Sequence, residues 1–328
     1  MFAIPWIAFI ALILVLLALD LGVLNRNAHV IGTKEALRWT IFWVALALLF
    51  SVAIFFMYEY HWMGIGIHEG ATESGWQATE EYITGYLIEK SLSLDNIAVI
   101  AMIFSYFSIP LKFQHRILFW GILGALIMRG AMILAGTALV QRFDWVLYVF
   151  AVFLLYTAYK TAFAHETNAS LADNRILKLA RRIFPVTSDV SSLHFFVRVD
   201  GKRAATPLFL ALILVESSDV IFAVDSIPAI FLVTTDPFIV FTSNIFAILG
   251  LRSLYFVLAS LLERFSYLRY SVTFILAYVG VKMLIGHHIV IPGWVSLVVI
   301  TLSLSVGIGV SVYRLRKHPI DAPAPPRD

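Results

Sequence analysis

The chain has 328 residues, of which 60% are hydrophobic and 14% are charged, and its mean hydropathy is +0.88. A soluble domain carries more charge, so this composition excludes a soluble globular protein and predicts an all-α polytopic membrane protein. The chain has no cysteine, which excludes disulfides, thiolate metal sites and cysteine nucleophiles. The formal charge of +3 is typical of basic cytoplasmic loops and does not indicate a nucleic-acid partner.

About nine apolar segments are long enough to cross a membrane, because an α-helix needs about 20 residues to span ~30 Å of hydrocarbon. In chain order these segments cover approximately residues 3–24, 38–58, 82–108, 116–139, 143–163, 205–232, 238–262, 267–285 and 292–313. They predict a single transmembrane domain over residues 1–318. The proline-rich end of the chain, PIDAPAPPRD, predicts a disordered tail at 319–328.

The basic residues of the connections predict the orientation of the chain. Connections that follow odd-numbered segments are rich in lysine and arginine, whereas the 59–81 connection contains five glutamates and no lysine or arginine. Cytoplasmic loops carry the excess of basic residues, so we expect the N-terminus outside and the C-terminus inside. The first segment lacks the basic stretch and the small-residue cleavage site of a signal peptide, and we expect the protein to retain it.

Two connections contain further features. The longest, at 164–204, is hydrophilic and basic, and its stretch NRILKLARRIF predicts a short amphipathic helix. This cytoplasmic loop is either a solvated segment that sets the orientation or a docking surface for a cytoplasmic partner. On the outer side, His61 and His68 lie near several glutamates. They are either a metal exit site or part of an ordinary solvated loop, because their spacing matches no fixed ligand pattern.

Five carboxylates lie inside two otherwise apolar segments. The third segment contains Glu89 and Asp95 in LIEKSLSLDNIAVIAMI, and the sixth contains Glu216, Asp219 and Asp225 in VESSDVIFAVDSIPAI. A charged side chain at the centre of the bilayer costs at least ~2.5–3.5 kcal/mol, so these acids require a partner or a ligand. One explanation is a structural network of protonated carboxyls, and the other is a binding site, which five acids in two segments favour.

The two acidic segments begin two similar units of three segments each. DNIAVI at Asp95 matches DSIPAI at Asp225, and the next segment of each unit contains a buried arginine after a glycine, Arg129 and Arg252. Each unit crosses the membrane three times, so the two have opposite orientations. The sequence therefore predicts a 3+3 inverted-topology repeat of helices 3–5 and 6–8, the construction of many secondary transporters. The units cover about 82–163 and 205–285.

The predicted site consists of oxygen donors. Carboxylate, amide and hydroxyl oxygens suit manganese, magnesium or calcium better than zinc or copper. Acids six residues apart lie roughly 120° apart around a straight helix, and Pro228 interrupts the backbone ladder. We therefore expect both helices to unwind or bend near mid-membrane so that the acids converge. The predicted metal ligands are Glu89, Asp95, Asn96, Glu216, Asp219, Asp225 and Ser226.

Four further polar residues are candidates for supporting roles. Arg129 and Arg252 either neutralise the acids or gate the substrate. Asp20 is either an interfacial residue or part of the pathway. Asn244 either supports the site or only bonds a neighbouring helix, as polar residues in bundles often do.

Several motifs resemble the TerC family of membrane proteins. They include DLGVLNR, EKSLSLDN, QHRILFWGILGALIMR, VESSDVIFAVDSIPAIF and DPFIVFTSNIFAILGLRSLYF, and the loop FFVRVDGKRAATPLFLALILVES resembles the Alx-like branch of that family. The resemblance runs from about Asp20 to Leu284. It implies an architecture like that of the LysE superfamily of exporters, a place in a bacterial inner membrane, manganese efflux, and links to tellurite resistance and alkaline response. The family's motifs match at Glu89, Asp95, Asn96, Glu216, Asp219, Asp225 and Ser226.

These observations favour a divalent-cation exporter, with manganese as the transported substrate, no permanently bound cofactor and protons as the exchanged ion. Such a protein is a transporter and not an enzyme, with the lipid bilayer and a metal ion as its partners. Two other classes stay open. One is a membrane scaffold or stress sensor that uses the 164–204 loop without transport, and the other is an intramembrane aspartyl enzyme, although no GxGD motif accompanies the aspartates. The sequence does not specify the oligomeric state.

Overall fold

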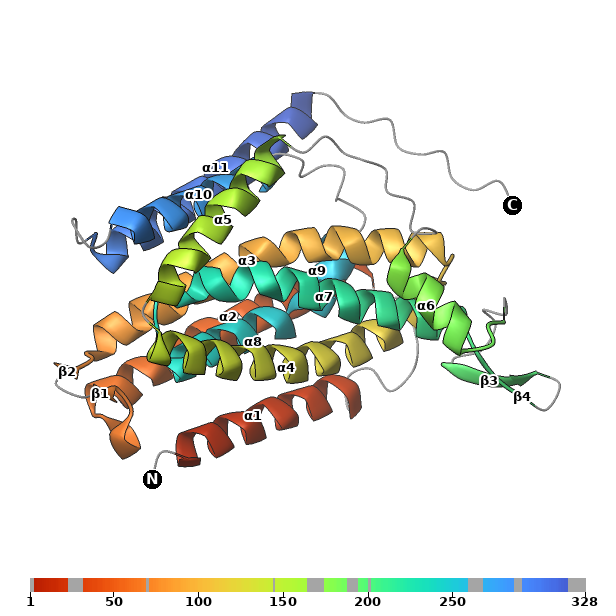
Figure 1. The fold of residues 1–328 in the computed structure, drawn as a ribbon, viewed down its shortest axis with the longest axis horizontal. Coiled ribbons are helices and arrows are strands. Elements are labelled where there is room, and N and C mark those ends of the chain that lie inside the picture. Colours follow the sequence, from red (N-terminus) through yellow and green to blue (C-terminus); the bar gives the residue numbers. More distant parts are fainter. Residues whose placement is uncertain are drawn as a thin grey trace.

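The fold is an all-α polytopic bundle in which one small two-stranded sheet lies at each end (Figure 1). The computed structural model describes residues 3–22, 32–68, 71–143, 145–163, 174–187, 194–199, 202–258, 268–285 and 291–317. The helices are α1 (Ala3–Gly22), α2 (Thr33–Glu59), α3 (Gly75–Tyr106), α4 (Leu111–Arg142), α5 (Trp145–Phe163), α6 (Arg175–Ile183), α7 (Pro207–Phe231), α8 (Pro237–Leu249), α9 (Leu251–Leu258), α10 (Leu268–Ile285) and α11 (Gly293–Lys317). The short elements are the 3-10 turn Trp62–Gly64 and the strands β1 (Ile67–His68), β2 (Ala71–Thr72), β3 (Phe196–Val199) and β4 (Lys202–Ala205).

Six helical stretches in the described part of the chain are long and apolar enough to cross a membrane. They are Lys34–Glu59, Leu111–Arg142, Trp145–Phe163, Pro207–Phe231, Pro237–Val257 and Gly293–Ser311. Ile4–Leu19 and Tyr270–Lys282 are shorter apolar helices, while α3 is 32 residues long and includes several charged residues. Large apolar side chains such as Leu49 and Leu302 are exposed on the outer helix faces, where a lipid bilayer covers them. The number of nine crossings and their orientation stay predictions.

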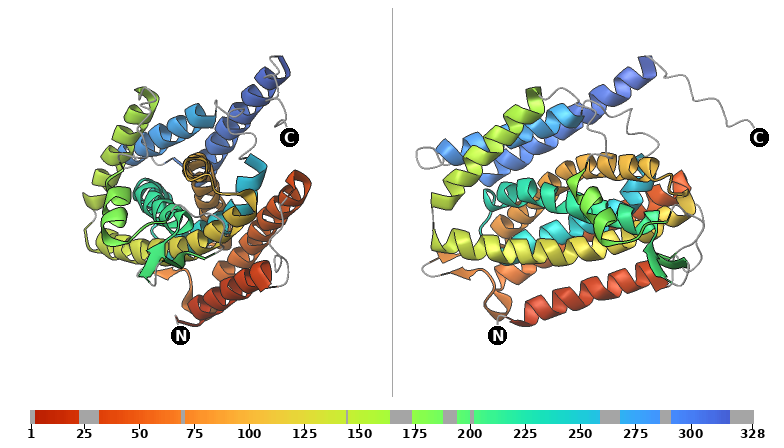
Figure 2. Two further views of the ribbon diagram at one scale, coloured as in Figure 1. Left: turned by 90° about the vertical axis from the view of Figure 1, so that its right-hand side faces the viewer. Right: turned by 45° about the vertical axis from the view of Figure 1, so that its right-hand side comes forward.

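Helices α3, α4, α7 and α8 form the centre of the molecule, and α8 is the most enclosed of them. Eleven of the 13 residues of α8 are buried. Asp236 begins this helix, because its Oδ1 accepts hydrogen bonds from the N–H groups of Phe238 and Ile239 at 2.7 and 3.1 Å. Helices α5, α10 and α11 form a layer on one side of α3, and α1 lies on the opposite side of the central helices (Figures 1 and 2).

The expected unwinding of the two acidic helices is wrong, because α3 and α7 each run as one continuous helix. Their serines bond backbone carbonyls of the preceding turn and do not open the helix. Ser93 donates to the Lys90 carbonyl at 2.8 Å, and Ser218 donates to the Leu214 carbonyl at 2.7 Å. Pro228 lies in the last turn of α7, where it removes one N–H close to the end of the ladder.

The interruption lies instead between α8 and α9, at Gly250. Lys90 reaches this break from α3 and donates to the Ala247 carbonyl at 3.1 Å. A positive charge at the last carbonyls of a helix is favourable because those carbonyls carry the negative end of the helix dipole. The bundle therefore contains a helix break, but the break lies between α8 and α9 and not in the acidic helices α3 and α7.

The amphipathic helix predicted in the 164–204 connection is confirmed as α6. Its Leu177 and Ala180 are buried in the cluster that includes the start of α7. The β3–β4 ladder was not predicted, and Phe196 of β3 fixes it to α7 by packing against Phe209 with ring centroids 4.4 Å apart. The β1–β2 pair in the connection between α2 and α3 was not predicted either.

We expect Gly280→Leu to lower the free energy of unfolding by about 1–3 kcal/mol through overpacking. A Cβ atom at Gly280 lies 2.9 Å from Leu155 Cγ and 3.2 Å from the carbonyl oxygen of Ala151, so α5 and α10 have no room for a side chain here. Gly309→Leu in α11 is the matched control, since no atom lies within 4 Å of its Cβ position. Thermal unfolding in detergent compares the two, and equal losses contradict the close approach of α5 and α10.

Candidate functional site

A fully buried arginine lies at the centre of the bundle. Arg129 of α4 is 1% exposed and contacts side chains from three other helices. Its Nε and Nη2 donate to the two carboxylate oxygens of Asp219 at 3.1 and 2.8 Å. Its Nη1 donates to Glu89 Oε1, to Asn244 Oδ1 at 3.0 Å and to Ser226 Oγ at 3.4 Å. The guanidinium fork thereby joins α3, α7 and α8 to α4.

The network lies near the middle of each helix. Asp219 is the thirteenth of the 25 residues of α7, and Glu89 is the fifteenth of the 32 residues of α3. Asn244, which is 0% exposed, closes the network, because its Nδ2 donates to Glu89 Oε2 at 3.2 Å. Five of the predicted site and supporting residues are therefore in contact with one another: Glu89, Arg129, Asp219, Ser226 and Asn244.

The surroundings explain why these charges are paired. Glu89 is 1% exposed and Asp219 is 9% exposed, so neither carboxylate is solvated by bulk water. An isolated ionised group in such a place is very costly, whereas pairing with a guanidinium and an amide satisfies it. Of the two roles considered for Arg129, neutralisation of the acids is what the contacts show.

Glu216 lies beside this network but outside its hydrogen bonds. Its carboxylate packs against Gly124 of α4 so closely that a Cβ atom there has no room. It also interacts electrostatically with Asp219. In the described part of the chain no three histidine, aspartate or glutamate side chains lie close enough to hold a metal ion by themselves. The side chains of Asp20, Asp95 and Asp225 are outside what the structure describes, so convergence of all five acids stays a prediction.

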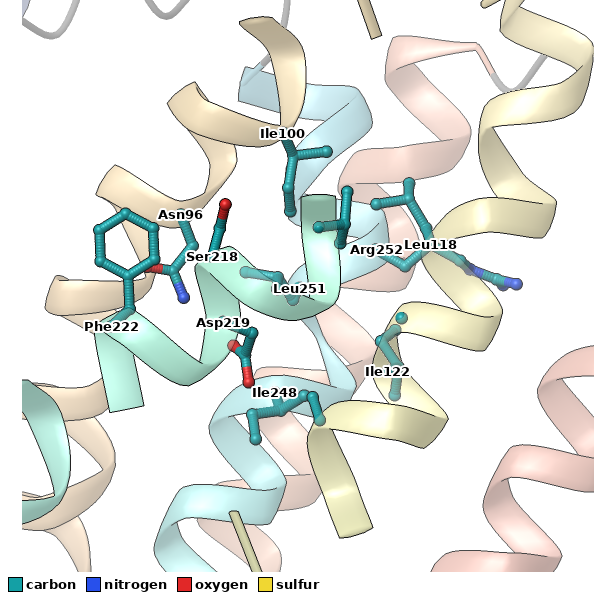
Figure 3. A pocket seen from close by; sticks show the side chains of 13 residues that line it. Asn96, Ile100, Leu118, Ile122, Ser218, Asp219, Phe222, Ile248, Leu251 and Arg252 are labelled. Atoms are coloured by element: carbon teal, nitrogen blue, oxygen red, sulfur yellow. The ribbon is translucent and has the colours of Figure 1, made fainter. Parts of the chain in front are cut away.

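A first, small cavity adjoins Asp219. Figure 3 shows Asn96, Ser218 and Phe222 on one side of it and Arg252 on the other. Asn96 is 5% exposed, and its Oδ1 is buried without a hydrogen-bond partner among the described residues. Arg252 is 6% exposed. These two predicted residues are therefore assembled around the same space as Asp219.

A second cavity also adjoins the network. Glu89, Asn96, Arg129 and Ser226 line it, together with Thr157 and Thr161 of α5 and with apolar side chains. Asn96 and Phe222 line both cavities.

The sequence analysis missed Lys90, Thr157 and Thr161. Lys90 had a clear signal, since it is a charged residue inside an apolar segment and next to Glu89. The two threonines have a weaker signal, because their spacing of four places them on one face of a helix but threonine is common in membrane helices.

The connection between α2 and α3 forms an acidic pocket that Glu73, Glu81 and Asp236 line together with threonines and Gln77. Glu73 precedes α3 and lies outside the membrane-spanning helices. Its burial and the charges of Glu81 and Asp236 raise the pKa of Glu73 to about 9. Of the two outer histidines, His61 has its Nδ1 3.4 Å from the Ile65 carbonyl oxygen, and the side chain of His68 is not described.

Comparison with known proteins gives the family. A model described as the integral membrane protein TerC family matches residues 74–318, which is most of the chain. The chain belongs to the TerC family. It is 49% identical to an uncharacterised membrane protein of Myxococcus xanthus over 321 residues, which are 98% of this chain and 96% of that protein. It is also 49% identical to Alx of Escherichia coli K12, named as a candidate membrane-bound redox modulator, over 296 residues, or 90% of each chain.

A Rickettsia bellii membrane protein of uncharacterised role is 42% identical over 317 residues, which are 96% of this chain and 99% of that protein. No solved structure matches the chain. The family, the apolar helices and the bacterial relatives together indicate a multi-pass protein of a bacterial inner membrane.

We expect Arg129→Met to destabilise the protein by about 3–5 kcal/mol, because it leaves two buried carboxylates without their cation. The double variant Arg129→Met/Asp219→Asn should recover part of the loss, since one of the two unpaired charges is then gone. Arg142→Met, at the exposed end of α4, is the matched control and should change stability by less than about 1 kcal/mol. Unfolding in mixed detergent micelles measures these three variants and Asp219→Asn alone, and strictly additive effects of the two substitutions contradict the ion pair.

We expect Glu73→Gln to make stability less dependent on pH. The carboxyl binds its proton more tightly in the folded protein, with a pKa of about 9 against its ordinary value of 4.5, so its contribution to stability falls as pH rises through this window. The variant stays neutral and should melt increasingly above the wild type between pH 5 and pH 9. Glu73→Asp retains a titrating carboxyl and should follow the wild-type slope. If the melting temperatures of the wild type and Glu73→Gln change with pH in parallel across that range, the raised pKa of Glu73 is disproved.

Proposed function

We propose that this protein exports a divalent cation, most readily Mn²⁺, from the bacterial cytoplasm and that protons return in exchange. The observation that carries the proposal is the network around Arg129, in which carboxylates from two helices meet at mid-helix beside two cavities. Charged groups inside a membrane bundle are expensive and commonly belong to ion pathways. We therefore propose a transporter and not an enzyme.

The donors of the site favour a hard cation. Glu89, Asp219 and Glu216 offer carboxylates, Asn96 and Asn244 offer amide oxygens, and the chain has no cysteine. Oxygen ligands suit manganese, magnesium and calcium, and the absence of thiolate removes a usual anchor of zinc and copper. Magnesium sheds water reluctantly and requires near-ideal octahedral distances, which favours manganese in a site built on four separate helices.

The charge balance explains the proposed exchange. When ionised, the carboxylates of Glu89, Asp219 and Glu216 carry −3 and the side chains of Arg129, Lys90 and Arg252 carry +3, which leaves no net charge on the described groups. A divalent cation makes that sum +2 unless charge moves elsewhere. Protons taken up by the carboxylates after the metal leaves restore the balance.

Arg129 acts as an internal cation in this proposal. Its guanidinium satisfies Glu89 and Asp219 in the structure, so an incoming metal ion has to replace it at one or both carboxylates. Because the guanidinium of Arg129 pairs with the carboxylates when no metal ion is bound, the site has a stable metal-free form. It also limits affinity, which an exporter requires in order to release its substrate.

The inverted repeat supplies the proposed alternation of access. In the repeat, Arg252 corresponds to Arg129, Asn96 to Ser226, and Glu89 to Asp219. Arg129 contacts Ser226 and Asp219, and the first cavity brings Arg252 together with Asn96 and Asp219. This correspondence supports two related half-sites, one closed by an arginine and one beside a cavity, on either side of mid-membrane.

The printed name of the Alx relatives suggests redox modulation as a second function. Thiol–disulfide exchange by this chain is excluded because it has no cysteine. A redox effect therefore fits this protein best as a consequence of a changed metal content in the cell.

We expect inside-out vesicles with the purified protein to take up Mn²⁺ when a pH gradient is imposed at constant membrane potential. Glu89→Gln, Asp95→Asn, Glu216→Gln, Asp219→Asn and Asp225→Asn should each reduce the rate at least about tenfold, because a lost donor leaves a hard cation under-coordinated. Glu35→Gln, in the first turn of α2, is the control and should transport normally.

Full transport by any two of the five variants contradicts a single convergent site. Uptake that ignores the pH gradient contradicts proton exchange. Uptake of magnesium, zinc or copper in preference to manganese contradicts the assigned substrate while leaving an exporter in place.

A further inference from the structure

We infer that Thr157 and Thr161 of α5 are cation ligands, which together with Asn96 form an oxygen-lined binding chamber beside the Arg129 network. The chamber is the second cavity, and the inference rests on the proposed function because it assigns a substrate position within it. Neither threonine belongs to the acidic motifs of α3 and α7.

The walls of the chamber differ in character. Its polar lining comes from four helices, and its apolar lining includes Leu92, Phe222, Val272 and Leu276. The polar lining residues are Glu89, Asn96, Arg129, Thr157, Thr161 and Ser226. Apart from Arg129, all of these offer oxygen atoms, which is the donor set of a hard cation.

Asn96 is the observation that points to a ligand. Its Oδ1 is buried without a hydrogen-bond partner among the described residues, and the residue is 5% exposed. An unsatisfied buried acceptor is costly, so a bound water molecule or ion is the expected partner for it. A cation satisfies an amide oxygen, and most of the other polar residues that line the chamber with Asn96 also offer oxygens.

The two threonines are placed to continue this lining. They are four residues apart, so they lie on one face of α5 about 6 Å apart along the helix axis. That face adjoins the central helices, since α5 packs against both α7 and α10. The close approach at Gly280 holds α5 and α10 together. Both threonines thus line the same cavity as Glu89, on a helix that is held by its packing against α7 and α10.

The charges of the lining residues indicate what the chamber does during transport. Among the described lining residues Glu89 is the one carboxylate, and its two oxygens are bound by Arg129 and Asn244. The other described oxygens of the lining are neutral and are available to a cation while Glu89 is still paired with Arg129. The centres of water molecules can occupy about 110 Å³ of the chamber, and one water needs only about 10–15 Å³ on that measure, so an ion that keeps part of its hydration shell has room. The chamber is a waiting position from which the ion displaces Arg129.

The first experiment measures Mn²⁺ binding and transport by the full-length protein in lipid nanodiscs and vesicles, with the electron paramagnetic resonance of free Mn²⁺ as the binding signal. Thr157→Val and Thr161→Val remove the hydroxyls at nearly constant volume, and the double variant should bind Mn²⁺ at least tenfold more weakly. The Thr157→Ser/Thr161→Ser variant retains the hydroxyls and should bind within about twofold of the wild type. Thr137→Val, at a buried position of α4 outside the chamber lining, is the matched control.

The second experiment does not depend on the valine variants folding well. The chain has no cysteine, so Thr161→Cys and Thr137→Cys each introduce a single thiol for maleimide labelling. Mn²⁺ should slow labelling at position 161 in a concentration-dependent manner and leave position 137 unchanged.

The outcomes separate the two levels of the argument. Wild-type-like Mn²⁺ binding in the double valine variant, or labelling at 161 that ignores Mn²⁺, overturns the chamber while the exporter stands. A wild-type protein that neither binds nor transports Mn²⁺ overturns the proposed function and the chamber with it. Weaker binding in the valine variant together with recovery in the serine variant supports both.

Discussion

The buried guanidinium of Arg129 is the interaction on which the central helices depend. It replaces the water that Glu89 and Asp219 would otherwise require, and it does so at mid-helix, where no solvent can take over. Because the Asp219 contact uses both Nε and Nη2, a shift of α4 along α7 by one residue breaks the fork geometry. In hydrocarbon, where apolar side chains give no preference for one helix neighbour over another, this polar contact fixes the helix registers.

The sequence predicted which residues form this centre better than it predicted the helix geometry that brings them together. Charge inside an apolar segment has few explanations, so Glu89, Asp219, Arg129, Asn244 and Ser226 were all chosen before their contacts were seen, and the structure joins them. The expected unwinding of the acidic helices failed because serine hydroxyls such as those of Ser93 and Ser218 bond carbonyls of the preceding turn within an intact helix. The acids meet through an arginine from a third helix, so they need not face each other directly.

Other features depend on helix phase and tertiary packing, which a single sequence does not reveal. Thr157 and Thr161 matter through the face of α5 that they share, and that face is set by the contact at Gly280. Lys90 stands next to Glu89 but turns to the end of α8, since adjacent residues on a helix point about 100° apart. The 164–204 loop shows the same division, because the periodic α6 was predicted and the short β3–β4 ladder was not.

Asn96 and Phe222 link these observations to the proposed transport. Both line the cavity beside Arg252 and the chamber beside Thr157, so they form the wall between the two spaces. An amide with an unsatisfied oxygen and an aromatic ring make a small barrier, whose side chains can rotate without moving a helix. Under the proposed function, an ion held by Asn96 on one side is already adjacent to Asp219 on the other. The distance to be crossed is then one side-chain layer, and the charge of Arg129 decides when that crossing is favourable.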